Sequence, residues 1–144
     1  MGSINDLLKR LQAVNIPREA EEALIDSSQE LVNAQKDQLL RGIRKDGKLI
    51  GKYKNKAYAA KKAALNPLAG LGNVDLKLTG QLYKDVFVDV RSDVFVLDSA
   101  DIKTGGLIKK YGDPFGLTPQ SRETVIKEKL RKVYTDRVKD KLKL

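Results

Sequence analysis

The chain has 144 residues, no cysteine and no histidine, and its 28 basic side chains outnumber 19 acidic ones for a net charge of +9. The missing residue types exclude disulfides, thiolate nucleophiles and a Ser-His-Asp triad, and they remove the commonest metal ligands. Charged residues make up 33% of the chain and hydrophobic residues 41%, which favours a modest core under a well-solvated surface. The length suits a single domain over residues 1–144.

The N-terminal part of the chain predicts helices. Apolar residues recur at helical spacing from Ile4 to Val14, which predicts a short first helix. A second helix is predicted from Pro17 to about Ile43, because proline is favoured in a first turn and acidic residues follow it. Ser27 and Ser28 interrupt the apolar stripe of this helix, so thin packing is expected there.

The middle of the chain predicts a loop followed by a short helix. Asp46-Gly47 ends the preceding helix, and the polar stretch 48–56 is predicted to be an exposed loop or a weak hairpin. Residues 57–65 are rich in strong helix formers, and Asn66-Pro67 ends that helix.

Alternating valines give the clearest strand signal. Residues 86–90 and 94–97 predict two antiparallel strands, with a turn at 91–93. If the ring of Phe95 is buried, Phe95→Ala is expected to cost about 3 kcal/mol or more.

The C-terminal part of the chain predicts two more helices. A short helix is expected at 104–111, and Thr118 is a suitable N-cap for a long last helix that begins with Pro119. One apolar stripe follows that helix: Ile126, Leu130, Val133, Tyr134, Val138 and Leu142. The predicted fold is therefore α+β, with N-terminal helices, a sheet based on an antiparallel β-hairpin, and a long C-terminal helix.

The positive charge is concentrated in one segment. Residues 41–62 hold nine basic side chains and one acidic one, so this stretch carries +8 of the net charge, with Tyr53 and Tyr58 between its lysines. The basic loop or arm is centred on residues 44–56. The candidate partner- or DNA-contacting residues are Arg41, Arg44, Lys45, Lys48, Lys52, Lys54 and Lys56.

Three interpretations of this basic segment are open. Its cations and aromatic rings could neutralise phosphates and stack on bases. It could instead dock on an acidic protein surface, or it could be a solvated loop whose charge keeps the protein soluble. Because like charges repel in a compact state, each interpretation predicts an exposed and mobile segment in the isolated protein.

Catalytic, cofactor and metal sites are not predicted. The glycines at 70 and 72 and at 105 and 106 lack phosphate-loop spacing, and the aspartates at 85–101 lack calcium-loop spacing. We therefore expect no enzymatic activity, no cofactor and no bound metal; a small enzyme using Asp or Lys chemistry is the remaining alternative.

Two segments resemble one protein family. Residues 75–83 (DLKLTGQLY) lead directly into the hairpin and resemble the L-T-G-x-L segment of tailed-phage virion-morphogenesis proteins, which include tail-completion and neck proteins. Residues 111–118 (YGDPFGLT) resemble the Y-G … F-G-L-(T/S) element before that family's last helix, although the family's His-x-x-Gly element is absent. The resemblance covers roughly residues 53–130. From the residues themselves, tight turns are expected at Thr79, Gly80 and Gly116, with Leu82 and Tyr83 entering the core.

The resemblance implies a non-enzymatic structural protein of the phage head–tail junction. Such a protein would form a homo-oligomeric ring and contact other virion proteins, and it could touch DNA without sequence preference. It would be made in the host cytoplasm and reside in the virion, with no membrane segment and no small-molecule substrate. The alternative function is sequence-independent nucleic-acid binding through residues 41–62.

Overall fold

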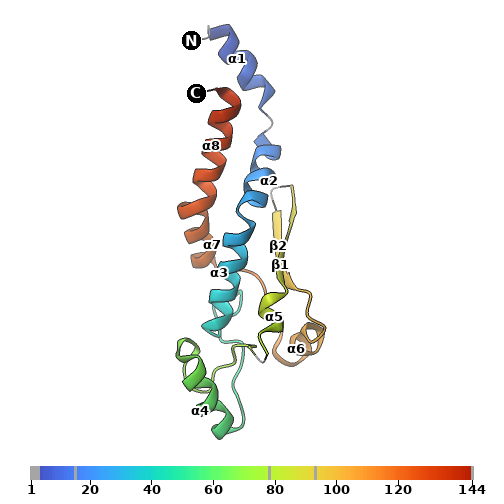
Figure 1. Ribbon diagram of the computed structural model, residues 1–144, viewed down its shortest axis with the longest axis vertical. Coiled ribbons are helices and arrows are strands. Elements are labelled where there is room, and N and C mark those ends of the chain that lie inside the picture. Colours follow the sequence, from blue (N-terminus) through green and yellow to red (C-terminus); the bar gives the residue numbers. More distant parts are fainter. Residues whose placement is uncertain (1–3, 15, 78, 93, 144) are drawn as a thin grey trace.

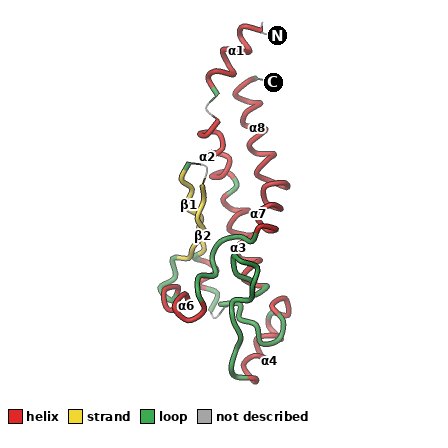
Figure 2. The backbone as a smooth tube through the Cα atoms, turned by 180° about the vertical axis from the view of Figure 1, so that it is seen from behind, coloured by secondary structure: helices red, strands yellow, loops and turns green. Residues whose placement is uncertain are grey.

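Two helical rods lie side by side along the length of an elongated molecule. The computed structural model describes residues 4–14, 16–77, 79–92 and 94–143 (Figures 1 and 2). The first rod is made of α1 (Ile4–Ala13), α2 (Ile16–Asp26) and α3 (Ser28–Leu40). The second runs back beside it and is made of α7 (Pro119–Val125), the π-helical turn η2 (Ile126–Leu130) and α8 (Arg131–Leu142).

A β-hairpin and three short helices complete the fold. Strands β1 (Val86–Arg91) and β2 (Val94–Ser99) lie beside the first rod, and β1 packs on α2 and α3 (Figure 1). The short helices are α4 (Lys56–Leu65) at the end of the molecule far from α1, α5 (Gln81–Lys84) and α6 (Thr104–Tyr111), with a 3₁₀ turn η1 (Pro67–Ala69) after α4. The predicted α+β fold is confirmed.

The register of the hairpin decides which side chains face the core. Residues directly opposite each other in an antiparallel pair share a face of the sheet. The pairs Val88–Leu97 and Val90–Phe95 face the helices, whereas three pairs form the outer face: Phe87–Asp98, Asp89–Val96 and Arg91–Val94. Both strands were predicted correctly; of the predicted turn, Asp93 lies outside the described residues.

Two apolar clusters hold the elements together. One joins the end of α3 to α5 and β1 and has these buried residues: Leu39, Ile50, Val74, Leu76, Leu82, Tyr83, Val86 and Phe115. The other joins α2 and α3 to β2 through Leu24, Leu31, Leu97 and Leu117. Leu82 and Tyr83 enter the core as predicted. They follow Gly80, whose φ of +87° is a backbone conformation that favours glycine.

The prediction of one helix from Pro17 to about Ile43 was wrong at two places. The helix is divided at Ser27, which is fully buried, so the thin packing expected there was also wrong. At the other end, α3 stops at Leu40 because Gly42 adopts a φ of +72° and the Ile43 amide donates back to the Gln38 carbonyl.

The last helix is also less regular than predicted. Thr118 caps it as expected, since its hydroxyl oxygen accepts a hydrogen bond from the Ser121 amide at 3.1 Å. The π-helical turn at η2 then interrupts the α-helical pattern. Arg137 ties α8 to α2 by ion pairs with Glu19 and Asp26, both at 3.1 Å.

Two buried glutamines of α3 fix the turn before the last helix. The Gly116 amide donates to Gln35 Oε1 at 2.7 Å, and Gln38 Nε2 donates to the Gly116 carbonyl at 2.8 Å. Gln38 Oε1 also accepts from the Thr118 amide at 2.9 Å. Gly116 has a φ of +111°, so this turn combines a glycine conformation with side-chain hydrogen bonds from a distant helix.

Phe95→Ala should lower the free energy of unfolding by less than it would if the phenylalanine ring were fully buried. The ring packs against the second apolar cluster and is mostly but not fully buried, because it also lines an open groove. We expect the free energy of unfolding to fall by about 2–3 kcal/mol, slightly below the range for a fully buried phenylalanine. Denaturant unfolding of the two proteins measures this, and a loss above about 3 kcal/mol would show that the ring is covered in solution.

Candidate functional site

The backbone of the basic segment is hydrogen-bonded to the rest of the fold. Ile43 and Leu49 form an isolated antiparallel bridge, and Lys52 forms a second one with Asn73. Ile50 is buried, the Val74 amide donates to the Gly51 carbonyl at 3.0 Å, and the Tyr53 amide donates to the Gly72 carbonyl at 2.8 Å. The segment therefore presents exposed side chains on a hydrogen-bonded backbone, and its mobility in the isolated protein stays a prediction.

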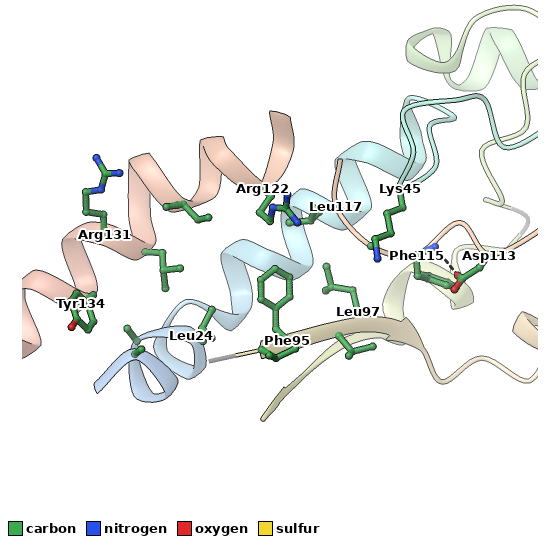
Figure 3. A pocket seen from close by; sticks show the side chains of 17 residues that line it. Leu24, Lys45, Phe95, Leu97, Asp113, Phe115, Leu117, Arg122, Arg131 and Tyr134 are labelled. Atoms are coloured by element: carbon green, nitrogen blue, oxygen red, sulfur yellow. Dashed lines mark hydrogen bonds between the residues drawn. The ribbon is translucent and has the colours of Figure 1, made fainter. Parts of the chain in front are cut away.

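The seven predicted basic residues do not form one site. Arg41 pairs with Asp37 at 3.0 Å, and Arg44 pairs with Asp46 at 2.8 Å. The stem of Lys45 lies over Gly116, on the side of the molecule that holds the apolar groove (Figure 3). Lys48 and Lys56 are exposed, and only Lys52 and Lys54 line a common cavity.

This cavity, the basic–aromatic cleft, has a volume of about 660 Å³. Its apolar floor is made of Ile50, Val74, Leu76 and Leu107, and its walls carry Lys52, Tyr53, Lys54, Tyr58, Lys110 and Tyr111. Three segments build it: residues 50–58 of the basic segment, residues 74–76, and Leu107 to Tyr111 of α6. Every charged side chain among the described residues that line it is a lysine.

The aromatic rings of the cleft are arranged by close packing. The rings of Tyr53 and Tyr58 meet edge to face with centroids 5.0 Å apart, and Lys110 Nζ lies 5.1 Å from the centroid of the Tyr111 ring. Gly51 is required beneath Tyr111, since a Cβ atom at Gly51 would lie 2.7 Å from a carbon of that ring. Tyr58 is the exposed ring of the set.

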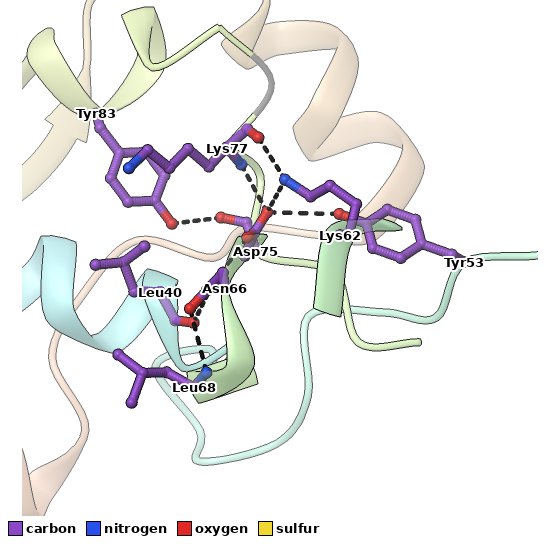
Figure 4. Close-up of polar contacts among 8 residues, drawn as sticks. All are labelled: Leu40, Tyr53, Lys62, Asn66, Leu68, Asp75, Lys77 and Tyr83. Carbon is purple, nitrogen blue, oxygen red and sulfur yellow. Dashed lines mark hydrogen bonds and ion pairs between the residues drawn. The ribbon is translucent and has the colours of Figure 1, made fainter. Parts of the chain in front are cut away.

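A buried carboxylate next to the cleft joins α4 to the core (Figure 4). Asp75 is 2% exposed; it pairs with Lys62 at 2.9 Å and accepts hydrogen bonds from the Asn66 side chain and the Lys77 amide, each at 2.9 Å. Asn66 also donates to the Leu40 carbonyl at 2.7 Å, and the Tyr83 hydroxyl donates to the Asp75 carbonyl.

These contacts fix the protonation states around Asp75. Burial by itself raises the pKa of Asp75, but the hydrogen bonds from Lys62, Asn66 and the Lys77 amide outweigh it and hold the pKa below its ordinary value. Burial and the nearby Asp75 charge raise the pKa of both Tyr53 and Tyr83. Asp75 is thus a structural anion, and the two tyrosines keep their hydroxyl protons.

An apolar groove of about 720 Å³ opens between β2, α2 and the last helix (Figure 3). The side chains of Leu24, Phe95, Leu97 and Leu117 line it. Its charged lining residues are Lys45, Asp113, Arg122 and Arg131. A hollow with an apolar lining and a mostly cationic border suits contact with a partner surface that is apolar at its centre and acidic around it.

Comparison with protein-family models, with curated proteins and with solved structures found no match. In the described part of the chain, no three Asp or Glu side chains are grouped as metal ligands would be. Within the same residues, no helix has the length and apolar character needed to cross a bilayer.

Sequence reasoning missed three residues that shape this region. Lys110 and Tyr111 lie about fifty positions from Tyr58, and no local pattern connects the two segments. The sequence analysis treated Asp75 only as part of the L-T-G-containing segment and did not predict its buried ion pair. A usable signal for Tyr111 was the glycine at position 51, because a glycine within a basic stretch can mark the close approach of another group.

Proposed function

We propose that this protein is a non-enzymatic structural subunit of the phage head–tail junction that assembles through contacts with further copies of itself and with other virion proteins. The observation that carries the proposal is the uncovered apolar outer face of the hairpin. Phe87, Val94 and Val96 share this face and are 43%, 59% and 58% exposed. We call these three side chains the hairpin surface.

The hairpin surface has the properties of an assembly contact. In the described part of the chain the sheet has only two strands, so each strand has an open edge that another chain could pair with. Val94 and Val96 also line the apolar groove, which makes the outer face and the groove one continuous surface. Contiguous apolar surface of this kind marks sites of protein–protein contact, and a second copy of the chain is the occupant we propose.

The two segments that resemble the virion-morphogenesis family build this same region. Residues 75–83 lead through α5 into β1, and residues 111–118 place Phe115 and Leu117 beside the groove. The resemblance supports the virion as the site of action, and the uncovered hairpin supports assembly as the activity.

Charged replacements on the hairpin surface should reduce self-association without unfolding the protein. Phe87→Lys, Val94→Glu and Val96→Lys each introduce a charge directly opposite one of the other sign: Asp98, Arg91 and Asp89. The triple variant should therefore keep its hairpin while losing the apolar contact, and its dissociation constant should rise at least about tenfold. Sedimentation over a concentration series measures this.

A matched control places the same net charge change away from the hairpin. Gln29→Lys, Asn33→Glu and Gln120→Lys lie on α3 and α7 and should leave the association constant unchanged. Wild-type protein that stays monomeric at all concentrations, or a triple variant that associates as well as wild type, would refute assembly through this surface.

The second candidate function is sequence-independent nucleic-acid binding. The specific observation in its favour is that Lys48, Lys52, Lys54 and Lys56 are exposed on an anchored backbone. Such cations can neutralise phosphates without an ordering cost as large as that of a free loop. This function uses a different surface from the hairpin, so the two candidates can be tested separately.

A further inference from the structure

We infer that the basic–aromatic cleft binds single-stranded nucleic acid, with a base against the Tyr58 ring and the adjoining phosphates against Lys52, Lys54 and Lys110. The inference rests on the second candidate function and deepens it. It names the strandedness of the ligand and adds a contact from α6, outside the basic segment.

The chemistry of the cleft matches both parts of a nucleotide. Its three charged lining residues are all lysines, which attract phosphate, and three tyrosines stand among them. The cavity of about 660 Å³ lies in the range of small-ligand sites and has an apolar floor that suits the face of a base. Asp75, the nearest buried carboxylate, is neutralised by Lys62, so it does not oppose an anion.

The arrangement of the rings favours a single strand over a duplex. Tyr53 is held by its edge-to-face contact with Tyr58 and by a long 3.5 Å contact from its hydroxyl to Asp75, so it forms a fixed wall. Tyr58 leaves part of its ring exposed at the mouth of the cleft. Bases that are paired and stacked inside a duplex cannot reach that ring, whereas the unstacked bases of a single strand can.

Lys110 provides a sharp test because its neighbour is a matched control. Both Lys109 and Lys110 are exposed on α6, but only Lys110 lines the cleft. Lys109→Gln and Lys110→Gln change the net charge equally. A difference between their affinities for nucleic acid therefore reflects contact in the cleft and not the electrostatic field of the whole protein. Tyr58→Phe keeps the ring and is the corresponding control for Tyr58→Ala.

The experiment measures fluorescence anisotropy of a labelled oligothymidylate of about 12 nucleotides, and of a duplex of equal length, at low salt. We expect the single strand to bind more tightly than the duplex. Tyr58→Ala should weaken single-strand binding by about 5- to 150-fold, the range for loss of one stacked base. Lys110→Gln should also weaken it, while Tyr58→Phe and Lys109→Gln bind like wild type. Thermal unfolding temperatures equal to that of wild type show that the variants are folded. If Tyr58→Ala does not fold, the comparison of Lys110→Gln with Lys109→Gln tests the inference instead.

The other outcomes overturn the inference in distinguishable ways. Equal binding of single strand and duplex, with Lys109→Gln and Lys110→Gln equally weakened, would leave only backbone neutralisation by the basic segment. Absence of binding to either probe would remove the second candidate function as well. If Tyr58→Ala instead impaired association of the chain with no nucleic-acid binding in wild type, the cleft would be a protein contact.

Discussion

Replacing Asp75 with alanine is expected to lower the free energy of unfolding by about 3–5 kcal/mol, the range for removal of one partner from a buried ion pair. The carboxylate is 2% exposed and receives Lys62, the Asn66 side chain and the Lys77 amide. Without it, the Lys62 side chain, which is 11% exposed, loses the carboxylate that it pairs with. Urea unfolding of wild type and variant measures the difference.

Two controls separate this effect from a general loss of charge. Asp37 also pairs with a cation, but it is 57% exposed, so Asp37→Ala should cost less than about 0.5 kcal/mol. The double replacement Asp75→Leu with Lys62→Met removes both charges and should cost less than the two single replacements together. A loss below about 1 kcal/mol in Asp75→Ala would show that the network does not hold α4 to the core.

The same carboxylate should make stability depend on pH in the acid range. Its folded pKa lies below the ordinary value of 3.8, so folding favours the ionised form. The stabilisation is therefore complete well above pH 4 and is lost as the pH falls through the folded pKa. The stability gap between wild type and Asp75→Asn should be constant from about pH 5 to 7 and narrow below about pH 4. A constant gap down to pH 3 would contradict this assignment.

Local patterns predicted the elements whose signal lies within a few neighbouring residues. The alternation of Val86, Val88 and Val90 predicted the first strand of the hairpin. Thr118 followed by Pro119 predicted where the last helix begins. Gly42 was a further local signal that was overlooked. A glycine after an apolar stripe commonly ends a helix in the left-handed conformation, and here it stops α3 before Ile43.

Tertiary contacts decided the features that the sequence analysis missed. Gln35 and Gln38 are polar residues on the buried face of a helix, yet they satisfy the backbone of a turn about eighty positions away. Ser27 is buried where two helices divide, although a serine by itself predicts neither burial nor a helix break. The cleft likewise depends on Tyr111 meeting Gly51, which no spacing within either segment encodes.

Replacing Lys48, Lys52, Lys54 and Lys56 with glutamine is expected to weaken DNA binding by more than about tenfold and to flatten its salt dependence. Each phosphate neutralised contributes about −0.9 in duplex DNA, or about −0.7 in a single strand, to the slope of log affinity against log salt concentration. Four lost contacts therefore flatten the slope by up to about 3.6 for duplex and about 2.8 for single-stranded DNA. The fold should remain intact because all four side chains are exposed. Anisotropy titrations from low to moderate salt give both slopes.

The matched control carries the same four charge changes on the last helix. Lys132, Lys139, Lys141 and Lys143 are exposed on or just after α8, which runs from α7 toward α1 and away from the end of the molecule that holds α4 (Figure 1). If DNA binding depends only on net charge, both quadruple variants will lose the same amount of affinity and show the same change in salt dependence. That result would contradict a site at residues 48–56. A larger loss in the first variant locates the contact there.

The same variant also separates DNA from protein as the partner of the basic segment. Should the counter-charge be an acidic face of a neighbouring subunit, DNA binding will be absent from wild type and the variant will fail in assembly. Salt would then weaken assembly of wild type and have little effect on any residual assembly of the variant. Normal assembly together with no DNA binding at low salt, in both proteins, would make residues 48–56 a solvated stretch whose charge serves solubility alone.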